Sequence, residues 1–225
     1  MRPIRVTHET FLDTCGTGGD GARTFNISTA AAIVVAAAGV PVAKHGSRSV
    51  SSRSGSSDVL TALGVDVLAE LPTVERCVAE LGIGFCFAPL YHPAMKRVSE
   101  VRRALGVPTI FNLLGPLANP AVVPCQVLGV GKPAQRPLLA AALRTLGTRR
   151  AVVVSGEDGL DEVTLAALTR VSLIEGDAIT ESVWTPEEFG VARSSLDPLT
   201  IDGPEESAAL IGRIFAGETG PRATS

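Results

Sequence analysis

Three polar segments of the chain, each preceded by an apolar run, contain the candidate ligand-binding and catalytic residues. Residues 15–29 read CGTGGDGARTFNIST, a glycine loop with one carboxylate, Asp20. Residues 44–58 read KHGSRSVSSRSGSSD, and residues 155–163 read SGEDGLDEV. Glycine loops and basic side chains bind phosphate, and carboxylates bind Mg²⁺. The three segments together indicate a site for a phosphorylated ligand with a metal ion.

The glycine loop is expected to turn backbone N–H groups of residues 16–19 toward an anion. Asn26, Ser28 and Thr29 would add donors at the start of a helix. A glycine turn that only reverses the chain is one alternative, and plain N-capping by Asn26 or Ser28 is another. These structural roles remain open beside the functional one.

A dinucleotide site is a weaker interpretation of the same loop. GTGGDG matches the GxGxxG pattern, but the helix is expected only near Ser28. The second strand is followed by Lys44 and His45, where an NAD site needs an acid for the ribose hydroxyl. The context therefore disfavours a dinucleotide.

The basic segment suits a diphosphate. Lys44 supplies a point charge, Arg48 and Arg53 supply planar forks, and the serines supply neutral donors. A histidine such as His45 is more often structural when it stands alone. In this company we interpret it as a site residue.

The acidic segment contains Glu157, Asp158, Asp161 and Glu162. A solvated acidic turn is the ordinary interpretation of such a run. Opposite a basic phosphate loop, however, these acids suit Mg²⁺, which takes one or two carboxylates together with water and phosphate oxygens.

Composition indicates a globular α/β protein. The 225 residues are 45% apolar and 19% charged, with 23 glycines and a net charge of −3, so a nucleic-acid footprint is not expected. Four scattered cysteines without a CxxC pair predict reduced thiols and no zinc cluster. The start lacks the apolar core of a signal peptide, and the apolar stretch 30–42 is too short to span a bilayer. We expect a cytoplasmic protein without a membrane partner.

Alternating strand and helix patterns predict a mainly parallel sheet flanked by helices. The expected strands cover residues 10–15, 40–43, 83–88, 126–130 and 151–154, and a hairpin covers 171–186. The expected helices cover residues 28–38, 56–63, 72–81, 95–105, 133–146 and 204–215, with Ser56 or Asp58 capping the second. Ligands of such sheets bind beyond the carboxyl ends of the strands, where the three polar segments fall.

A further segment, VRRALGVPTIFNLLGPLANP at residues 101–120, lies between the basic and acidic segments. Arg102 and Arg103 are expected near a helix end, where C-capping would explain one of them. FNLLGPLANP is too apolar for an ordinary surface loop. We expect it to pack under the site, with Asn112 bonding local backbone.

These segments together resemble the anthranilate phosphoribosyltransferases of tryptophan biosynthesis, which have the nucleoside phosphorylase and phosphoribosyltransferase fold. The resemblance rests on GTGGD, NIST, KHGxRSVSSxSG, FAPLYHPAMK, VRRALG, TIFNLLGPLANP and DGLDE in family order, from about residue 12 to about residue 196. It implies a single glycosyltransferase α/β domain over residues 1–225. The family's N-terminal helices and C-terminal end are not matched, so we expect the helical subdomain to be largely missing and the family homodimer to be weakened.

The resemblance implies transfer of a phosphoribosyl group from phosphoribosyl pyrophosphate to anthranilate, with Mg²⁺ as cofactor. Lys44 and Asp20 would be catalytic, and Ser28, Asp161 and Glu162 would bind the metal. Arg102 matches the arginine that meets the anthranilate carboxylate. The implied substrate-binding residues are Gly16, Gly19, Asp20, Thr24, Asn26, Ile27, Ser28, Thr29, Lys44, His45, Gly46, Ser47, Arg48, Ser49, Val50, Ser51, Ser52, Ser56 and Arg102.

Two residues refine this expectation. Asp20 would serve the parts of the ligand that are not phosphate, by accepting from a ribose hydroxyl or from metal-bound water. Ser47 departs from the family's KHGNR, where an asparagine helps to contact anthranilate. The alternatives are a pyrimidine nucleoside phosphorylase of the same fold and a non-catalytic phosphoribosyl- or nucleotide-binding relative.

Overall fold

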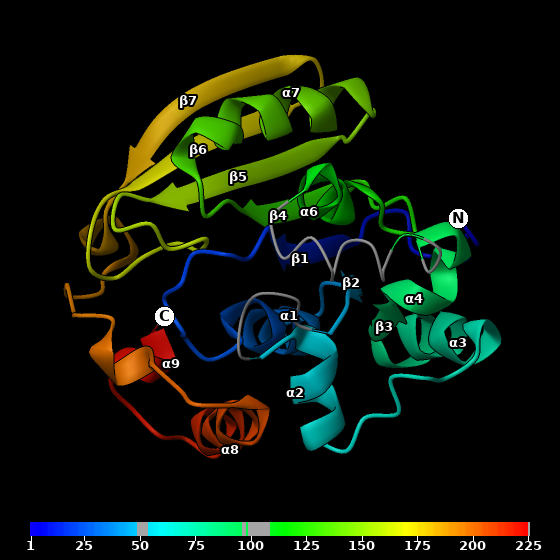
Figure 1. The fold of residues 1–225 in the computed structure, drawn as a ribbon, viewed down its shortest axis with the longest axis horizontal. Coiled ribbons are helices and arrows are strands. Elements are labelled where there is room, and N and C mark those ends of the chain that lie inside the picture. Colours follow the sequence, from blue (N-terminus) through cyan, green and yellow to red (C-terminus); the bar gives the residue numbers. More distant parts are fainter. Residues whose placement is uncertain (49–53, 96–97, 99–108, 225) are drawn as a thin grey trace.

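The computed structural model describes residues 1–48, 54–95, 98 and 109–224. The strands of this part form one sheet in the order β3-β2-β1-β4-β5-β6-β7 (Figure 1). They are β1 (Leu12–Gly16), β2 (Val42–Gly46), β3 (Ile83–Phe87), β4 (Cys125–Gly129), β5 (Arg150–Gly156), β6 (Thr169–Glu175) and β7 (Ala178–Trp184). Strands β1 to β5 pair in parallel, while β5, β6 and β7 pair antiparallel. The predicted mainly parallel sheet is confirmed.

The order of the strands places a switch point beside β1. The chain leaves β1 through helix α1 (Ile27–Ala37) to reach β2 on one side, and later returns to place β4 on the other side. Gly16, the last residue of β1, pairs in register with Gly129, the last residue of β4. Ligands of open α/β sheets bind at such a point, outside the carboxyl ends of the strands.

The helices flank this sheet. They are α1, α2 (Ser56–Ala62), α3 (Leu71–Leu81), α4 (Ala88–Tyr91), α6 (Ile110–Leu114), α7 (Arg136–Thr145), α8 (Pro204–Phe215) and α9 (Pro221–Thr224), with 3-10 turns at Gly115–Leu117, Pro133–Gln135, Pro186–Phe189 and Asp197–Leu199. The helix predicted at 95–105 falls largely outside the described residues, as do Arg53, Arg102 and Arg103. No helix in the described ranges is long and apolar enough to cross a membrane.

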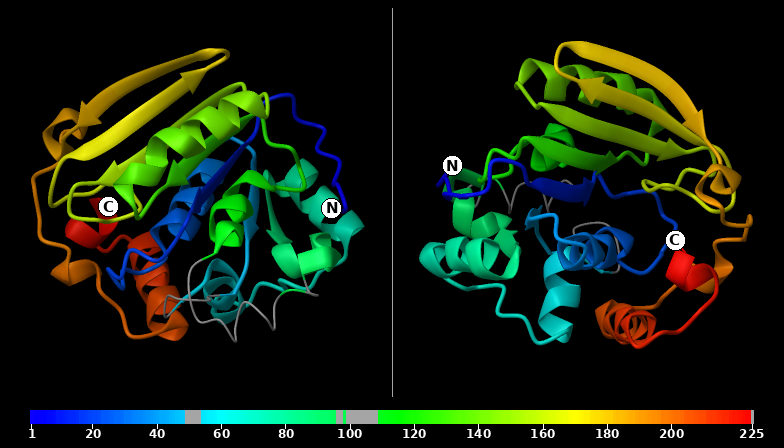
Figure 2. Two further views of the ribbon diagram at one scale, coloured as in Figure 1. Left: turned by 45° about the horizontal axis from the view of Figure 1, so that its top comes forward. Right: turned by 180° about the vertical axis from the view of Figure 1, so that it is seen from behind.

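Three apolar clusters hold the helices in place. One joins α1, α2 and α8 through residues such as Ile27, Val59 and Leu210. A second packs α3 on β2 and β3, and a third packs α7 on β4, β5 and β6. Figure 1 shows α7 along β5 and β6, and Figure 2 shows α8 beside α2 from two further directions. The carboxyl ends of β1 and β2 lie outside these clusters and line a cavity.

Two differences between the predicted and the observed elements bear on the site. The second strand covers Val42–Gly46 instead of residues 40–43, so Lys44 and His45 lie within the strand and not beyond its end. The strand extends because it pairs with β3 through Gly46, and its two polar residues are buried against partners from β1. Helix α2 is capped by Gly55, whose N–H donates to Asp58 Oδ2 at 3.1 Å, so neither Ser56 nor Asp58 is the N-cap.

Candidate functional site

A cavity of about 290 Å³ lies at the carboxyl ends of β1 and β2. All three polar segments contribute to its wall, which confirms that they converge. Of the residues named from the sequence, it is lined by Gly16, Asp20, Thr24, Asn26, Ile27, Ser28, Lys44, His45, Gly46, Ser47, Arg48, Ser56, Asn112, Asp161 and Glu162. Gly19 and Thr29 do not line it, and Ser49, Val50, Ser51, Ser52 and Arg102 lie outside the described residues.

Helix α1 begins at the cavity wall because Asn26 caps it. Asn26 Oδ1 accepts from the N–H of Thr29 at 3.0 Å and from the Ser28 hydroxyl at 3.3 Å. N-capping is therefore real, and it coexists with exposure of Asn26 and Ser28 to the cavity. The N–H of Thr29 is taken by the cap and the residue is buried, so Thr29 does not offer the donor predicted for it.

Lys44 rises from the middle of β2 into the cavity floor. Its Nζ donates to the carbonyl oxygen of Thr14 and lies 3.3 Å from the Ser28 hydroxyl. Burial lowers the pKa of Lys44, and the nearby Asp13 carboxylate opposes that shift. The contact with Ser28 places the ammonium group beside the start of α1. The ammonium group and the helix dipole there both favour a negatively charged ligand.

Asp13 supports Lys44 from below and was not predicted. The carboxylate is fully buried and accepts from the N–H of His45 at 3.1 Å and from Asn119 Nδ2 at 2.8 Å. It also interacts with the positive charge of Lys44. Burial raises the pKa of Asp13, and Lys44 opposes that shift. The sequence signal was a carboxylate inside the apolar strand FLDTC, which has no structural purpose without a buried partner.

The acidic segment supplies two carboxylates. Asp161 Oδ2 accepts from the N–H of Gly18 at 2.8 Å. Burial, followed by the charge of Asp20, raises the pKa of Asp161 to about 6, and burial with the charge of Asp161 raises the pKa of Glu162. Crowded, desolvated carboxylates repel one another, so the site favours a cation between them.

The donor set fits Mg²⁺. Asp161 and Glu162 line the cavity with the Ser28 hydroxyl, so every one of these ligands is oxygen, as Mg²⁺ prefers. Within the described ranges, no three His, Cys, Asp or Glu side chains form a ready-made metal cage. A magnesium ion would therefore complete its coordination with water or with phosphate oxygens of a ligand.

Two glycines admit the acidic segment. A Cβ added at Gly129 would lie 1.5 Å from the carbonyl oxygen of Asp161, and one at Gly16 would lie 2.5 Å from its Oδ2. The N–H of Thr17 bonds the carbonyl of Gly129 at 2.9 Å, and the N–H of Gly18 is taken by Asp161. The predicted anion cradle at residues 16–19 is therefore corrected in part, because these glycines make room for a carboxylate.

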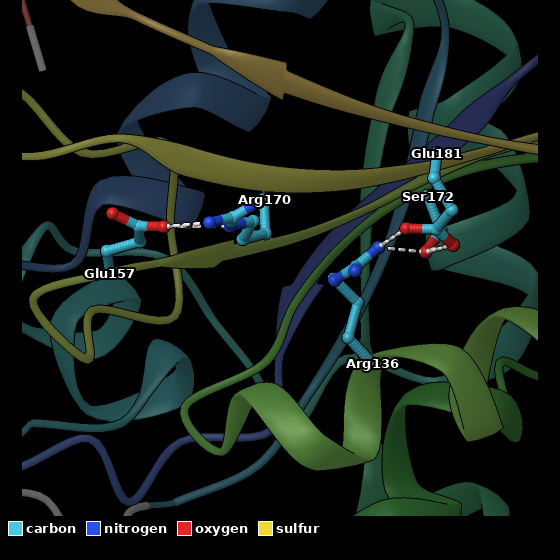
Figure 3. Close-up of polar contacts among 5 residues, drawn as sticks. All are labelled: Arg136, Glu157, Arg170, Ser172 and Glu181. Carbon is cyan, nitrogen blue, oxygen red and sulfur yellow. Dashed lines mark hydrogen bonds and ion pairs between the residues drawn. The ribbon is translucent and has the colours of Figure 1, made fainter.

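The other acids of this segment shape it. Asp158 Oδ2 accepts from the Thr164 hydroxyl at 2.5 Å, and Glu157 forms an ion pair with Arg170 of β6 at 2.5 Å (Figure 3). Neither acid lines the cavity. Glu157 and Asp158 thus stabilise the loop, whereas Asp161 and Glu162 line the cavity.

His45 provides no positive charge. Burial, followed by His92, lowers the pKa of His45 to about 3, and the two Nε2 atoms lie 3.3 Å apart. The ring is neutral at pH 7 and lines the cavity as a hydrogen-bonding group. His92 was not singled out in the sequence. The neighbouring Ser47 donates its hydroxyl to the carbonyl of Arg48 at 2.8 Å.

The apolar segment 111–120 follows the prediction only in part, because Pro116 and Asn119 are buried whereas α6 has no buried residue and Leu114 is 44% exposed. Gly115 and Pro116 line the cavity, and Pro116 is held by Gln126, whose Nε2 donates to its carbonyl at 2.7 Å. Asn112 Oδ1 accepts from the N–H of Thr109 at 3.0 Å, as predicted for local backbone.

Comparison with known families decides the family of the chain. A model of the glycosyl transferase family, a/b domain, matches residues 8–224. The chain belongs to this glycosyl transferase family. Its relatives include an anthranilate phosphoribosyltransferase of Moorella thermoacetica, 50% identical over 97% of this chain and 65% of the relative. One of Desulfitobacterium hafniense is 54% identical over 94% of this chain and 63% of the relative.

Solved structures of anthranilate phosphoribosyltransferases have the same fold. Anthranilate phosphoribosyltransferase from Thermus thermophilus matches with a TM-score of 0.92 and 50% identity, over 99% of this chain and 66% of that one. The Saccharomyces cerevisiae enzyme in complex with PRPP and Mg matches with a TM-score of 0.85 and 34% identity, over 93% of this chain and 58% of that one. The chain spans somewhat under two thirds of the length of these relatives.

Proposed function

We propose that the chain transfers the phosphoribosyl group of 5-phosphoribosyl 1-pyrophosphate to anthranilate. The products would be N-(5-phosphoribosyl)anthranilate and pyrophosphate, in tryptophan biosynthesis. The observation that carries the proposal is one cavity that joins the buried Lys44 ammonium, the start of α1 and the Asp161–Glu162 pair. The names of the relatives support the choice of acceptor.

Mg²⁺ is the proposed cofactor, held by Ser28, Asp161 and Glu162. A yeast relative is described in complex with PRPP and Mg, and the oxygen-only donor set of this chain is compatible with that ion. The bound metal would neutralise charge that develops on the departing pyrophosphate. Asp20, on the same cavity wall, would accept from a ribose hydroxyl or from metal-bound water.

The reaction does not need a strong general base from the protein. The amine of anthranilate forms a bond to the ribose C1 carbon while the bond from C1 to the pyrophosphate oxygen breaks, and the proton that the amine loses passes to water. An aromatic amine is already a nucleophile, so the residues mainly position it and stabilise the leaving group. Lys44 supplies fixed positive charge, and removing such a donor costs about 2.7 to 4 kcal/mol in the barrier.

The remaining cavity residues divide between the two substrates. The start of α1, with Thr24 and Asn26, and the Gly46–Arg48 segment would bind phosphoribosyl pyrophosphate. Lys44 and His45 would hold the same substrate, Ser56 would belong to the substrate-binding loops, and Ser47 would also contact anthranilate. We also propose that residues 1–225 form a single glycosyltransferase α/β domain. We propose the cytoplasm as its compartment, which the four free cysteines support.

The experiment follows anthranilate fluorescence with phosphoribosyl pyrophosphate and Mg²⁺. A loss of fluorescence that occurs only with Mg²⁺ present would support the transferase. Lys44→Ala and Asp20→Asn should each slow this loss. Phosphorolysis of a pyrimidine nucleoside would instead favour the phosphorylase alternative. Binding of phosphoribosyl pyrophosphate without turnover would show a non-catalytic relative. Unchanged kinetics in both variants would contradict the roles given to Lys44 and Asp20.

A further inference from the structure

Arg23 lies on the cavity wall in a backbone conformation that its side chain disfavours. Its φ is +57°, in the left-handed region that Gly, Asn and Asp tolerate and that long side chains rarely adopt. Val122 is the other non-glycine residue with positive φ in the described part of the chain. Such strain persists where the surrounding structure enforces it, and it is concentrated at functional sites.

The backbone around Arg23 is clamped. The carbonyl of Arg23 accepts from the N–H of Ile201 at 2.9 Å, and the N–H of Phe25 donates to the carbonyl of Leu199 at 2.9 Å. Between them, Thr24 forms an isolated antiparallel bridge with Thr200. The fold therefore holds residue 23 in place, and its side chain remains on the cavity wall.

Arg23 is exposed and lines the cavity, so it lies at the rim. Asp20, Asp161 and Glu162 line the same cavity, yet no ion pair or hydrogen bond within the described ranges engages the Arg23 side chain. Arginines elsewhere, such as Arg170 and Arg193, pair with glutamates. A free fork at this rim is suited to planar, bidentate contact with phosphate oxygens.

We propose that Arg23 is a substrate-binding residue that contacts the pyrophosphate group of the phosphoribosyl donor at the rim of the cavity. The inference rests on the proposed function, because it takes the phosphorylated ligand from there. Arg23 adds to the buried Lys44 a second, exposed positive charge, which can meet the ligand before the ligand reaches the cavity floor.

The test is calorimetric titration of inorganic pyrophosphate in the presence of Mg²⁺. Arg23→Gln keeps a long side chain at the same φ and removes the charge, whereas Arg23→Lys keeps the charge and removes the fork. We expect Arg23→Gln to weaken binding about tenfold, as befits a charge-assisted hydrogen bond, and Arg23→Lys to weaken it less. The affinity of the wild type should also fall more steeply with salt than that of Arg23→Gln.

Two further variants separate binding from stability and net charge. Arg23→Asn should melt at a higher temperature, because asparagine tolerates this φ, yet bind as weakly as Arg23→Gln. Arg144→Gln makes the same charge change at an exposed position outside the cavity and should bind like the wild type. Equal affinity in the wild type and Arg23→Gln would overturn the role of Arg23 alone. A wild type that neither binds pyrophosphate nor consumes anthranilate would overturn the proposed function as well.

Discussion

Replacing Gly129 with alanine should disrupt both the fold and the metal site. The added Cβ would lie 1.5 Å from the carbonyl oxygen of Asp161, where real Cβ atoms keep at least 3.0 Å from such neighbours. Because β4 is paired on both sides, the acidic loop must yield. Asp161 would then lose the hydrogen bond from the N–H of Gly18 and move away from Glu162 and the proposed metal site.

The stability cost can be bounded. Overpacking ordinarily costs about 1 to 3 kcal/mol, and here the atoms in conflict belong to backbone, so we expect about 3 kcal/mol or more. For a chain of this size that corresponds to a fall of about 6 to 12 °C in Tm. Gly212, in α8, meets nothing within 4 Å, so Gly212→Ala is the matched control and should stabilise by about 1 kcal/mol.

Urea unfolding would measure the first effect, and calorimetric titration of Mg²⁺ would measure the second. We expect Gly129→Ala to lower the urea midpoint and to weaken Mg²⁺ binding, while Gly212→Ala leaves Mg²⁺ binding unchanged. If Gly129→Ala were as stable as the wild type and bound Mg²⁺ equally well, the acidic loop could not cross the end of β4 as described.

Three further predictions concern charges and the acceptor. Asp13→Ala should lower the free energy of unfolding by about 3 to 5 kcal/mol in urea titrations, because it leaves Lys44 buried without its countercharge; a loss below about 1 kcal/mol would refute the pair. In metal-free protein, Asp161→Asn should stabilise the fold at pH 7.5, since the raised pKa of about 6 means that folding disfavours the charged form. That gain should shrink as the pH falls through about 6 toward about 4, and an equal gain at pH 4.5 would contradict it. Ser47→Asn should lower the KM for anthranilate in steady-state assays, and an unchanged or higher KM would argue against a contact there.

Much of the site could be predicted because its parts are contiguous in sequence. The segments around Asp20, Lys44 and Asp161 each combine an apolar strand with a polar continuation, and parallel strands bring such ends to one edge. Helix α8 was predicted with the observed bounds because Pro204 marks its first turn and its apolar residues recur at helical spacing.

What the sequence did not reveal depends on contacts between distant residues. Asp13 and Asn119 meet across 106 positions, and nothing local to either residue signals that pairing. The steric reason for Gly129 appears only when the acidic loop lies over β4, because only then does the Asp161 carbonyl oxygen occupy the space that a side chain at residue 129 would need. The positive φ of Arg23 likewise has no local signal in the sequence, and its carbonyl pairs with the N–H of Ile201, 178 residues away.

The end of β2 shows how pairing overrides local pattern. Lys44 and His45 look like loop residues after an apolar run, yet both are buried inside the strand. Burying them is tolerated because Asp13 meets the lysine charge and accepts the His45 N–H. A single buried carboxylate just before a glycine loop is therefore the clue that would have moved the predicted boundary.

Binding of phosphoribosyl pyrophosphate with and without Mg²⁺ tests the account most directly. The site combines Lys44 with a pair of acids that repel an unaccompanied polyanion, so a divalent ion must join the two. We predict tight binding by calorimetry in Mg²⁺, much weaker binding in EDTA, and a similar loss in Asp161→Asn even when Mg²⁺ is present. Equal affinity in all three conditions, or no binding in any, would contradict the central claim. That claim is that the glycine loop, the basic segment and the acidic segment form one metal-dependent phosphoribosyl site.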